Sequence, residues 1–211
     1  MQHINEELKN YIETEIIPRY NQFDAAHQVD HAQNVIAQSL ELAQQYGVNI
    51  NMTYAIAAYH DTGLIEGRTL HNLVSGRILR DDKKLRSFFS DEEIETMVEA
   101  VEDHRASCSH SPRSIYGMIV AEADRLIDGP SIVKRTIQYG LSHYPELHKE
   151  EHYRRFLRHM KEKFAEGGYL KTWLPESSNA IRLKKFQLLL KDEVATRNLF
   201  EQIWDEVKEA N

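Results

Sequence analysis

The stretch "MTYAIAAYHD", residues 52–61, constrains the fold more than any other part of the sequence. Wound as a helix, it presents apolar side chains on almost every side, which is typical of a helix at the centre of a bundle. It ends in His60 and Asp61, which follow Ala57 by three and four residues and so project from one face. Burying such polar groups costs several kcal/mol unless they are paired or bind a metal ion.

The rest of the sequence is also patterned for helices. No stretch shows the sustained alternation of a strand bounded by hairpin turns, so we expect an all-α fold. Ser90 and Glu93 have the spacing of a helix capping box, and Gly129 with Pro130 is expected to end a helix that reaches Ile127. Besides the helix that begins at the capping box, further helices are expected within residues 4–17, 28–46, 71–80, 112–127, 131–142, 149–165 and 178–208.

We expect these helices to form one domain. A chain of 211 residues can bury a sizeable core without disulfides or other covalent links. Residues 20–130 are expected to form this core, with an N-terminal helix in residues 1–19 packed on it. The helices of residues 131–211 are expected to complete the same domain.

Composition narrows the classes of protein to consider. The single cysteine, Cys108, excludes a disulfide within the chain and fits a reducing, cytoplasmic setting. The first residues, "MQHINEELKN", lack the pattern of a signal peptide, and no apolar run approaches the roughly 18 residues of a membrane span, so we expect no membrane partner. The net charge of −7 argues against binding a nucleic-acid backbone, although a metal or a local cluster of cations could still attract a small anionic substrate.

Two further polar residues lie on apolar helix faces, as His60 and Asp61 do. His31 precedes Val35 by four residues, and Asp124 follows Val120 by four. The four polar groups therefore point into the core from three helices. Two imidazoles and two carboxylates that converge are a plausible ligand set for a divalent ion and would be hard to satisfy without one.

Three short motifs carry a family resemblance. The stretches "DHAQNV" (30–35), "YHDTG" (59–63) and "AEADRL" (121–126) resemble the H…HD…D pattern of the HD-domain superfamily of metal-dependent phosphohydrolases. The resemblance covers about residues 20–130 and implies an HD-domain helical bundle with additional C-terminal helices. It also implies that the metal ligands are His31, His60, Asp61 and Asp124. The alternative is a degenerate relative in which these residues are core polar groups.

Two more histidines resemble the additional ligands of two-metal members of this family. They are His71 in "HNLVSGRIL" and His104 in "EDHRAS", and both share a helix face with apolar residues. With them the set would hold two ions bridged by Asp61. Alternatively, His71 and His104 contact substrate or water beside a single ion. His110 is open as a ligand, a phosphate contact or a loop residue.

The resemblance also indicates where substrate would be held. A metal-activated water would attack phosphorus, with Asp61 and Arg105 as the catalytic residues and Arg105 as a phosphate clamp. Arg68 and His110 are further candidates for substrate binding, and Lys83 with Lys84 could form an outer rim. Each of these cations could equally be a solvated surface residue. The expected cofactor is one or two divalent ions per chain, from among Mn, Fe, Mg, Co and Zn, and the histidines favour Fe, Mn or Zn.

Two stretches near the C-terminal part carry patterns outside this scheme. "HKEEH" (148–152) matches the spacing of an inverted zinc-protease motif, but its charged surroundings favour a solvated helix instead. The basic stretch that follows, Arg154 to Lys163, could line a site, form a dimer contact or be a solvated face. The loop around Trp173 and Pro175 could be a lid or a connection between helices.

The sequence therefore predicts an enzyme, a cytoplasmic phosphohydrolase acting on a small phosphorylated metabolite, with nucleotides as the leading class. The family branches marked by a Gly-Tyr-Pro signature or by a Glu-Asp pair after HD are disfavoured, because neither feature is found here. Two alternatives stay open: a di-iron oxygenase on the same scaffold, and a non-catalytic module that senses a nucleotide. The apolar face of the last helix is compatible with a homodimer.

Overall fold

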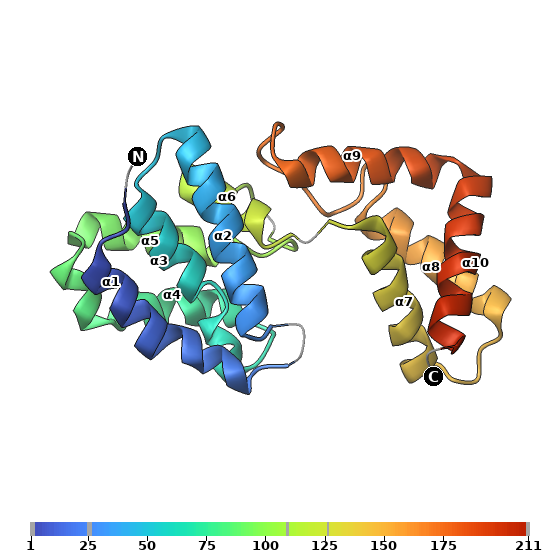
Figure 1. Cartoon of the computed structure of the whole chain (residues 1–211), viewed down its shortest axis with the longest axis horizontal. Helices are drawn as coiled ribbons and strands as arrows, with labels where there is room; N and C mark the ends of the chain where they lie inside the picture. Colours follow the sequence, from blue (N-terminus) through green and yellow to red (C-terminus); the bar gives the residue numbers. More distant parts are fainter. Residues whose placement is uncertain (1–2, 25–26, 109, 126, 210–211) are drawn as a thin grey trace. The chain divides into compact units, whose positions relative to one another are not determined.

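The computed structural model describes residues 3–24, 27–108, 110–125 and 127–209. In this part of the chain every regular element is a helix, which confirms the predicted all-α fold. The chain divides into two compact units, unit 1 from Met1–Arg125 and unit 2 from Leu126–Asn211 (Figure 1). Among the described residues, no helix is both long enough and apolar enough to cross a membrane.

The division after residue 125 lies close to the boundary predicted at residue 130. The structure delimits two compact units by their internal contacts. The assignment of residues 131–211 to the same domain as the core stays a prediction.

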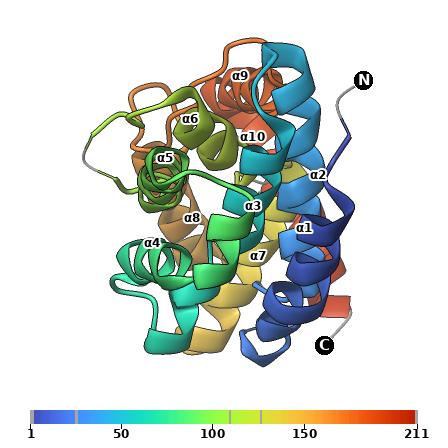
Figure 2. The same cartoon turned by 90° about the vertical axis from the view of Figure 1, so that its left-hand side faces the viewer.

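Unit 1 is a bundle built around one buried helix. Its α-helices are α1 (Glu6–Tyr11), α2 (Val29–Tyr46), α3 (Ile50–Tyr59), α4 (His71–Asp81), α5 (Asp91–Glu102) and α6 (Ile115–Ala123). Every residue of α3 from Met52 to Tyr59 is buried, and α2, α4, α5 and α6 all contact it. Figure 2 shows α3 in the middle of this unit, with α2 on one side and α4 and α5 on the other. The central position predicted for residues 52–61 is therefore confirmed.

Local sequence signals explain where these helices begin and end. The side chain of Asn49 accepts hydrogen bonds from the first amides of α3. The predicted capping box is present, because Ser90 Oγ accepts from the Glu93 amide and the Glu93 carboxylate accepts from the Ser90 amide. Gly47 ends α2 with a φ of 66°, a left-handed conformation that glycine adopts without strain.

Unit 2 has its own hydrophobic core. Its helices are α7 (Gly129–His143), α8 (Lys149–Lys163), α9 (Ser178–Lys191) and α10 (Glu193–Glu209). Phe156 and Phe200 are completely enclosed, with ring centroids 5.3 Å apart, and Trp204 packs on Phe200 at 5.6 Å. Because α10 contacts both α7 and α9, this core joins the elements of unit 2, and all its buried residues belong to that unit.

Four predicted helix boundaries are wrong. The helix expected over residues 4–17 is regular only in α1; it continues as a π-helical turn, Ile12–Ile16, and a 3₁₀ segment, Ile17–Gln22. Pro18 explains the change, because it cannot donate a backbone hydrogen bond to the preceding turn. In the helix expected over residues 112–127, the first helical residue is Ile115, since the Ser114 side chain caps it.

The other boundary errors lie in unit 2. Gly129 and Pro130 begin α7 rather than ending α6, because proline suits the first turn of a helix and Asp128 caps it. The stretch 178–208 is two helices, not one. Asp192 breaks it with an extended ψ of 105°, and its carboxylate accepts a 2.9 Å hydrogen bond from the Ala195 amide at the start of α10.

Candidate metal centre

Four of the predicted ligands converge at one place in unit 1. The set comprises His31 from α2, His60 and Asp61 after α3, and Asp124 after α6. Nε2 of His31 lies 3.1 Å from Nε2 of His60 and 3.4 Å from Oδ2 of Asp61, and it lies 3.3 Å from Oδ1 of Asp124. One donor atom from each residue lies within 4.8 Å of the others, so this group could hold a metal ion.

A second group shares Asp61 with the first. His71 opens α4 and His104 follows α5; their Nε2 atoms lie 3.3 Å apart, and each is 3.4 Å from Oδ1 of Asp61. The other oxygen, Oδ2, lies 3.4 Å from His31 and 3.3 Å from His60. The two oxygens of one carboxylate therefore face two sets of imidazoles, as a ligand that bridges two ions must.

Three of the imidazoles are oriented by hydrogen bonds to the nearby backbone. The Nδ1–H groups of His60, His71 and His104 each donate to the carbonyl three residues earlier, at 2.8, 2.8 and 2.6 Å. In a neutral ring Nε2 is then a lone-pair acceptor. The lone pairs of His71 and His104 thus face each other and Oδ1 of Asp61, an arrangement that is repulsive unless a proton or a cation lies between them. These imidazole nitrogens and carboxylate oxygens are the kinds of ligand that a divalent cation binds in proteins.

Burial and neighbouring charges also shift the pKa values of the two carboxylates and of His31. Burial acts to raise the pKa of Asp61, but the surrounding histidines outweigh it and hold this pKa well below its usual range. Burial likewise acts to raise the pKa of Asp124, but the neighbouring histidines, His31 foremost, outweigh it and lower this pKa to about 2. Burial lowers the pKa of His31, but Asp124 and Asp61 outweigh it and raise this pKa to about 9. Both carboxylates are therefore anionic at neutral pH and attract a cation.

A buried tyrosine supports the centre from the 3₁₀ segment Ile17–Gln22. The hydroxyl of Tyr20 donates to the carbonyl of Ala58 at 2.9 Å and accepts from the amide of Asp61 at 3.3 Å. Burial, followed by the charge of Asp61, raises the pKa of Tyr20 well above its usual value, so the hydroxyl keeps its proton. Sequence reasoning missed Tyr20, because it lies beyond Pro18, where the helical apolar pattern had already ended.

The two candidate arginines lie beside the centre. Nη1 of Arg105 donates to the carbonyl of Thr69 at 2.7 Å. Burial is the main cause that lowers the pKa of His71, and the charge of Arg105 adds to it. Arg68 is exposed, 3.7 Å from a carboxylate oxygen of Asp24 and 3.5 Å from the ring of His27. The His27 ring in turn packs edge-on against His31, with centroids 5.6 Å apart. Lys83 and Lys84 lie exposed in the 3₁₀ segment Lys83–Ser87.

His110 belongs to a different group. Its Nε2 lies 3.4 Å from Sγ of Cys108 and 3.8 Å from Oδ1 of Asp103, while Nδ1 donates to the carbonyl of Ser111 at 3.0 Å. Asp103 is already bound by Arg113, whose amide and guanidinium both donate to it. His110 is exposed, and the structure does not group it with the six residues above.

The protease-like spacing in α8 has a structural explanation. His148 is the N-cap residue of α8, and its amide donates to Glu151. His152 is buried against Trp204, with ring centroids 5.3 Å apart. In the described part of the chain, neither histidine belongs to a group of potential metal ligands.

Comparison with known proteins identifies the unit that carries the centre. No curated protein and no solved structure matches the chain. The family model described as "HD domain" matches residues 29–127. All six converging residues lie within these bounds, and HD domains bind divalent metals. The match covers just under half of the chain and supports its membership of the HD-domain superfamily.

Proposed function

We propose that this chain is a metal-dependent phosphohydrolase that cleaves a phosphate ester or anhydride of a small metabolite, with nucleotides as the leading class. The observation that carries the proposal is the position of Asp61, whose two oxygens face His31 and His60 on one side and His71 and His104 on the other. We assign these residues and Asp124 as ligands of two divalent ions.

A pair of divalent ions would lower the pKa of a water molecule and polarise the phosphoryl oxygens. The protein's part is to present oriented Nε2 atoms and two carboxylates, Asp61 and Asp124. Two carboxylates against two divalent ions leave the centre positively charged, which favours an anionic substrate. The predominance of imidazole ligands favours Fe, Mn or Zn over Mg.

We assign Arg105 as the phosphate clamp. Its anchor on the Thr69 carbonyl holds one side of the guanidinium, and its remaining N–H groups can donate to phosphate oxygens. Arg68 is a second candidate, because it contacts His27 beside the metal ligand His31. His110 is the weakest candidate for substrate binding, given its contacts with Cys108 and Asp103. A cytoplasmic location, suggested by the single cysteine, belongs to the same proposal.

The first experiment is elemental analysis of protein purified without chelator or affinity histidines. We expect about two ions per chain, and phosphate release from nucleotides when these ions are present. Asp61→Ala should lose metal and turnover while its circular dichroism stays helical. His148→Ala is the matched control, because it removes an imidazole from unit 2 and should leave both unchanged. Wild-type protein that binds no metal, even after addition of Mn or Fe, would contradict the assignment.

The same preparation tests the two alternatives. The ligand geometry is equally suited to a pair of iron ions, so oxygen uptake with an organic substrate, without phosphate release, would identify an oxygenase. Tight nucleotide binding without any turnover would identify a sensing module. Phosphate release that depends on the bound metal and on Arg105 is the result expected for the phosphohydrolase.

A further inference from the structure

Unit 2 contains a pocket that the proposed metal centre does not use. It has a volume of about 470 Å³, within the range of small-molecule sites, and every residue that lines it belongs to α7, to α8 or to Phe164 just after α8. Its polar wall includes Arg135, Arg155, His159 and Lys163, and its apolar wall includes Ile132 and Phe164. The basic stretch noted in the sequence is thus part of a cavity wall.

The charge of this pocket has one sign. It is lined by three permanent cations and a histidine, and none of its lining residues is acidic. Within the described part of the chain, neither Arg135 nor Arg155 has a carboxylate partner within ion-pair distance. In a protein with a net charge of −7, such a concentration of positive charge is a local exception. The pocket is therefore suited to an anion.

Arg155 is held in position before any ligand binds. Its Nη2 donates to the carbonyl of Thr136, and its guanidinium carbon lies 5.6 Å from the ring centroids of both Tyr139 and Tyr144. Gly140 makes room for it, because a Cβ there would lie 2.6 Å from Nη2. The buried Nε–H of Arg155 has no hydrogen-bond partner among the described residues. A guanidinium fixed in this way is preorganised for contact with an anion.

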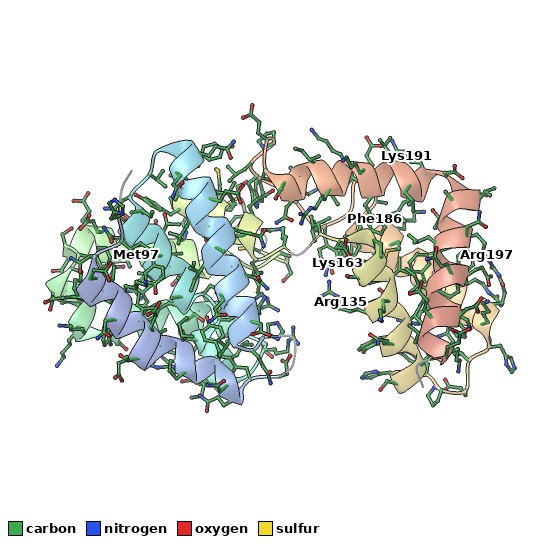
Figure 3. The ribbon with its side chains drawn as sticks, in the orientation of Figure 1. Met97, Arg135, Lys163, Phe186, Lys191 and Arg197 are labelled. Carbon is green, nitrogen blue, oxygen red and sulfur yellow. The ribbon has the colours of Figure 1, made fainter. Side chains whose placement is uncertain are left out.

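We propose that this pocket binds a small phosphorylated organic molecule, with its phosphate on the Arg135, Arg155 and Lys163 side chains and its apolar part against Ile132 and Phe164. Guanidinium groups match phosphate in shape and hydrogen bonding, which favours phosphate over a simple halide. Figure 3 shows Arg135, from α7, and Lys163, from the end of α8, projecting on the same side of unit 2. The site needs none of the metal ligands of unit 1.

The test is calorimetric titration of the full-length chain with ADP in the presence of a chelator, which removes any contribution of a metal centre. We expect one chelator-resistant site. Arg135→Gln should weaken ADP binding by about tenfold or more, since a charge-assisted phosphate contact is lost. Lys134→Gln is the matched control, because it removes the same charge from the adjacent, exposed position of α7 and should leave the affinity unchanged. Arg135→Lys should restore part of the affinity.

A second pair of variants tests the pocket independently, in case Arg135→Gln itself disturbs folding. Lys163→Gln should weaken binding, whereas Lys161→Gln, an exposed position on the same helix, should not. Helical circular dichroism checks each variant. Pyrophosphate and adenosine, titrated separately, should each bind more weakly than ADP. The proposal is overturned if chelator-resistant binding is absent, if pyrophosphate matches ADP, or if Lys134→Gln and Arg135→Gln weaken binding equally. Tighter binding of single-stranded RNA than of ADP would also overturn it.

Discussion

At the scale of single residues, Asp61 has a role that no other ligand shares. Each of its oxygens faces a different pair of imidazoles, so its loss affects both halves of the centre. We predict that Asp61→Asn loses about two ions per chain, whereas His104→Ala loses about one, because His104 faces only Oδ1. Elemental analysis of the two variants side by side checks this. Equal losses in both would mean that Asp61 does not bridge.

A second residue-scale prediction concerns Tyr11. Its hydroxyl donates to Oδ2 of Asp82 at 2.6 Å, and burial together with this carboxylate raises the pKa of Tyr11 from 10.0 to about 12. The folded chain therefore keeps a proton that the unfolded chain loses, so this contribution to stability is complete below pH 10 and declines toward pH 12.

Tyr11→Phe should accordingly lower the free energy of unfolding at neutral pH by about 1–2 kcal/mol. Its stability should also fall less steeply than that of the wild type between pH 10 and pH 12. Urea unfolding across this range measures both effects. Tyr46→Phe, which removes a hydroxyl from the end of α2, serves as the control. An unchanged slope in Tyr11→Phe would show that the hydroxyl does not titrate in this range.

At the scale of elements, the second half of the centre depends on how closely a turn approaches α4. The Gly63 amide donates to Oγ of Ser75 at 2.8 Å, and a Cβ on Gly63 would collide with the carbonyl of His71 and lie 2.5 Å from the Ser75 amide. Since these atoms are backbone, they cannot move aside cheaply. We predict that Gly63→Ala costs about 1–3 kcal/mol of stability and displaces His71 from Asp61.

Thermal unfolding and metal content measure the two consequences of Gly63→Ala. The control is Gly76→Ala in α4, where the added Cβ meets mainly the flexible side chain of Glu102. That substitution also gains helix propensity, so we expect little loss of stability. A Gly63→Ala variant as stable and as rich in metal as Gly76→Ala would show that the close approach is dispensable.

The elements also show what the sequence could and could not predict. The position of α3 and the convergence of His31 and Asp124 on its end follow from apolar spacing, because that spacing decides which helix face is buried. Tyr20 and the break at Asp192 do not follow, because each depends on hydrogen bonds with backbone atoms at other positions, which hydrophobic periodicity does not record. The pocket lined by Arg135 and Lys163 was visible only as a basic stretch, since its wall combines two helices.

At the scale of the whole molecule, the two units have separate hydrophobic cores. One is centred on α3, and the other includes Phe156 and Phe200. Because each unit buries its own apolar residues, we expect two unfolding transitions in differential scanning calorimetry rather than one. The proposed metal ligands all lie in unit 1. Only one of the two transitions should therefore respond to metal.

The size of this response follows from binding linkage. At a free metal concentration about 100 times the dissociation constant, the unit that binds the metal gains about 2.7 kcal/mol, while the other gains nothing. Adding chelator should lower one transition, and the Asp61→Asn variant should lack this metal-dependent shift altogether. ADP added in the presence of chelator should instead raise the second transition, in which Arg135 takes part. A single transition that shifts with metal would show that the chain unfolds as one cooperative unit, and the separation of the two cores would have no thermodynamic consequence.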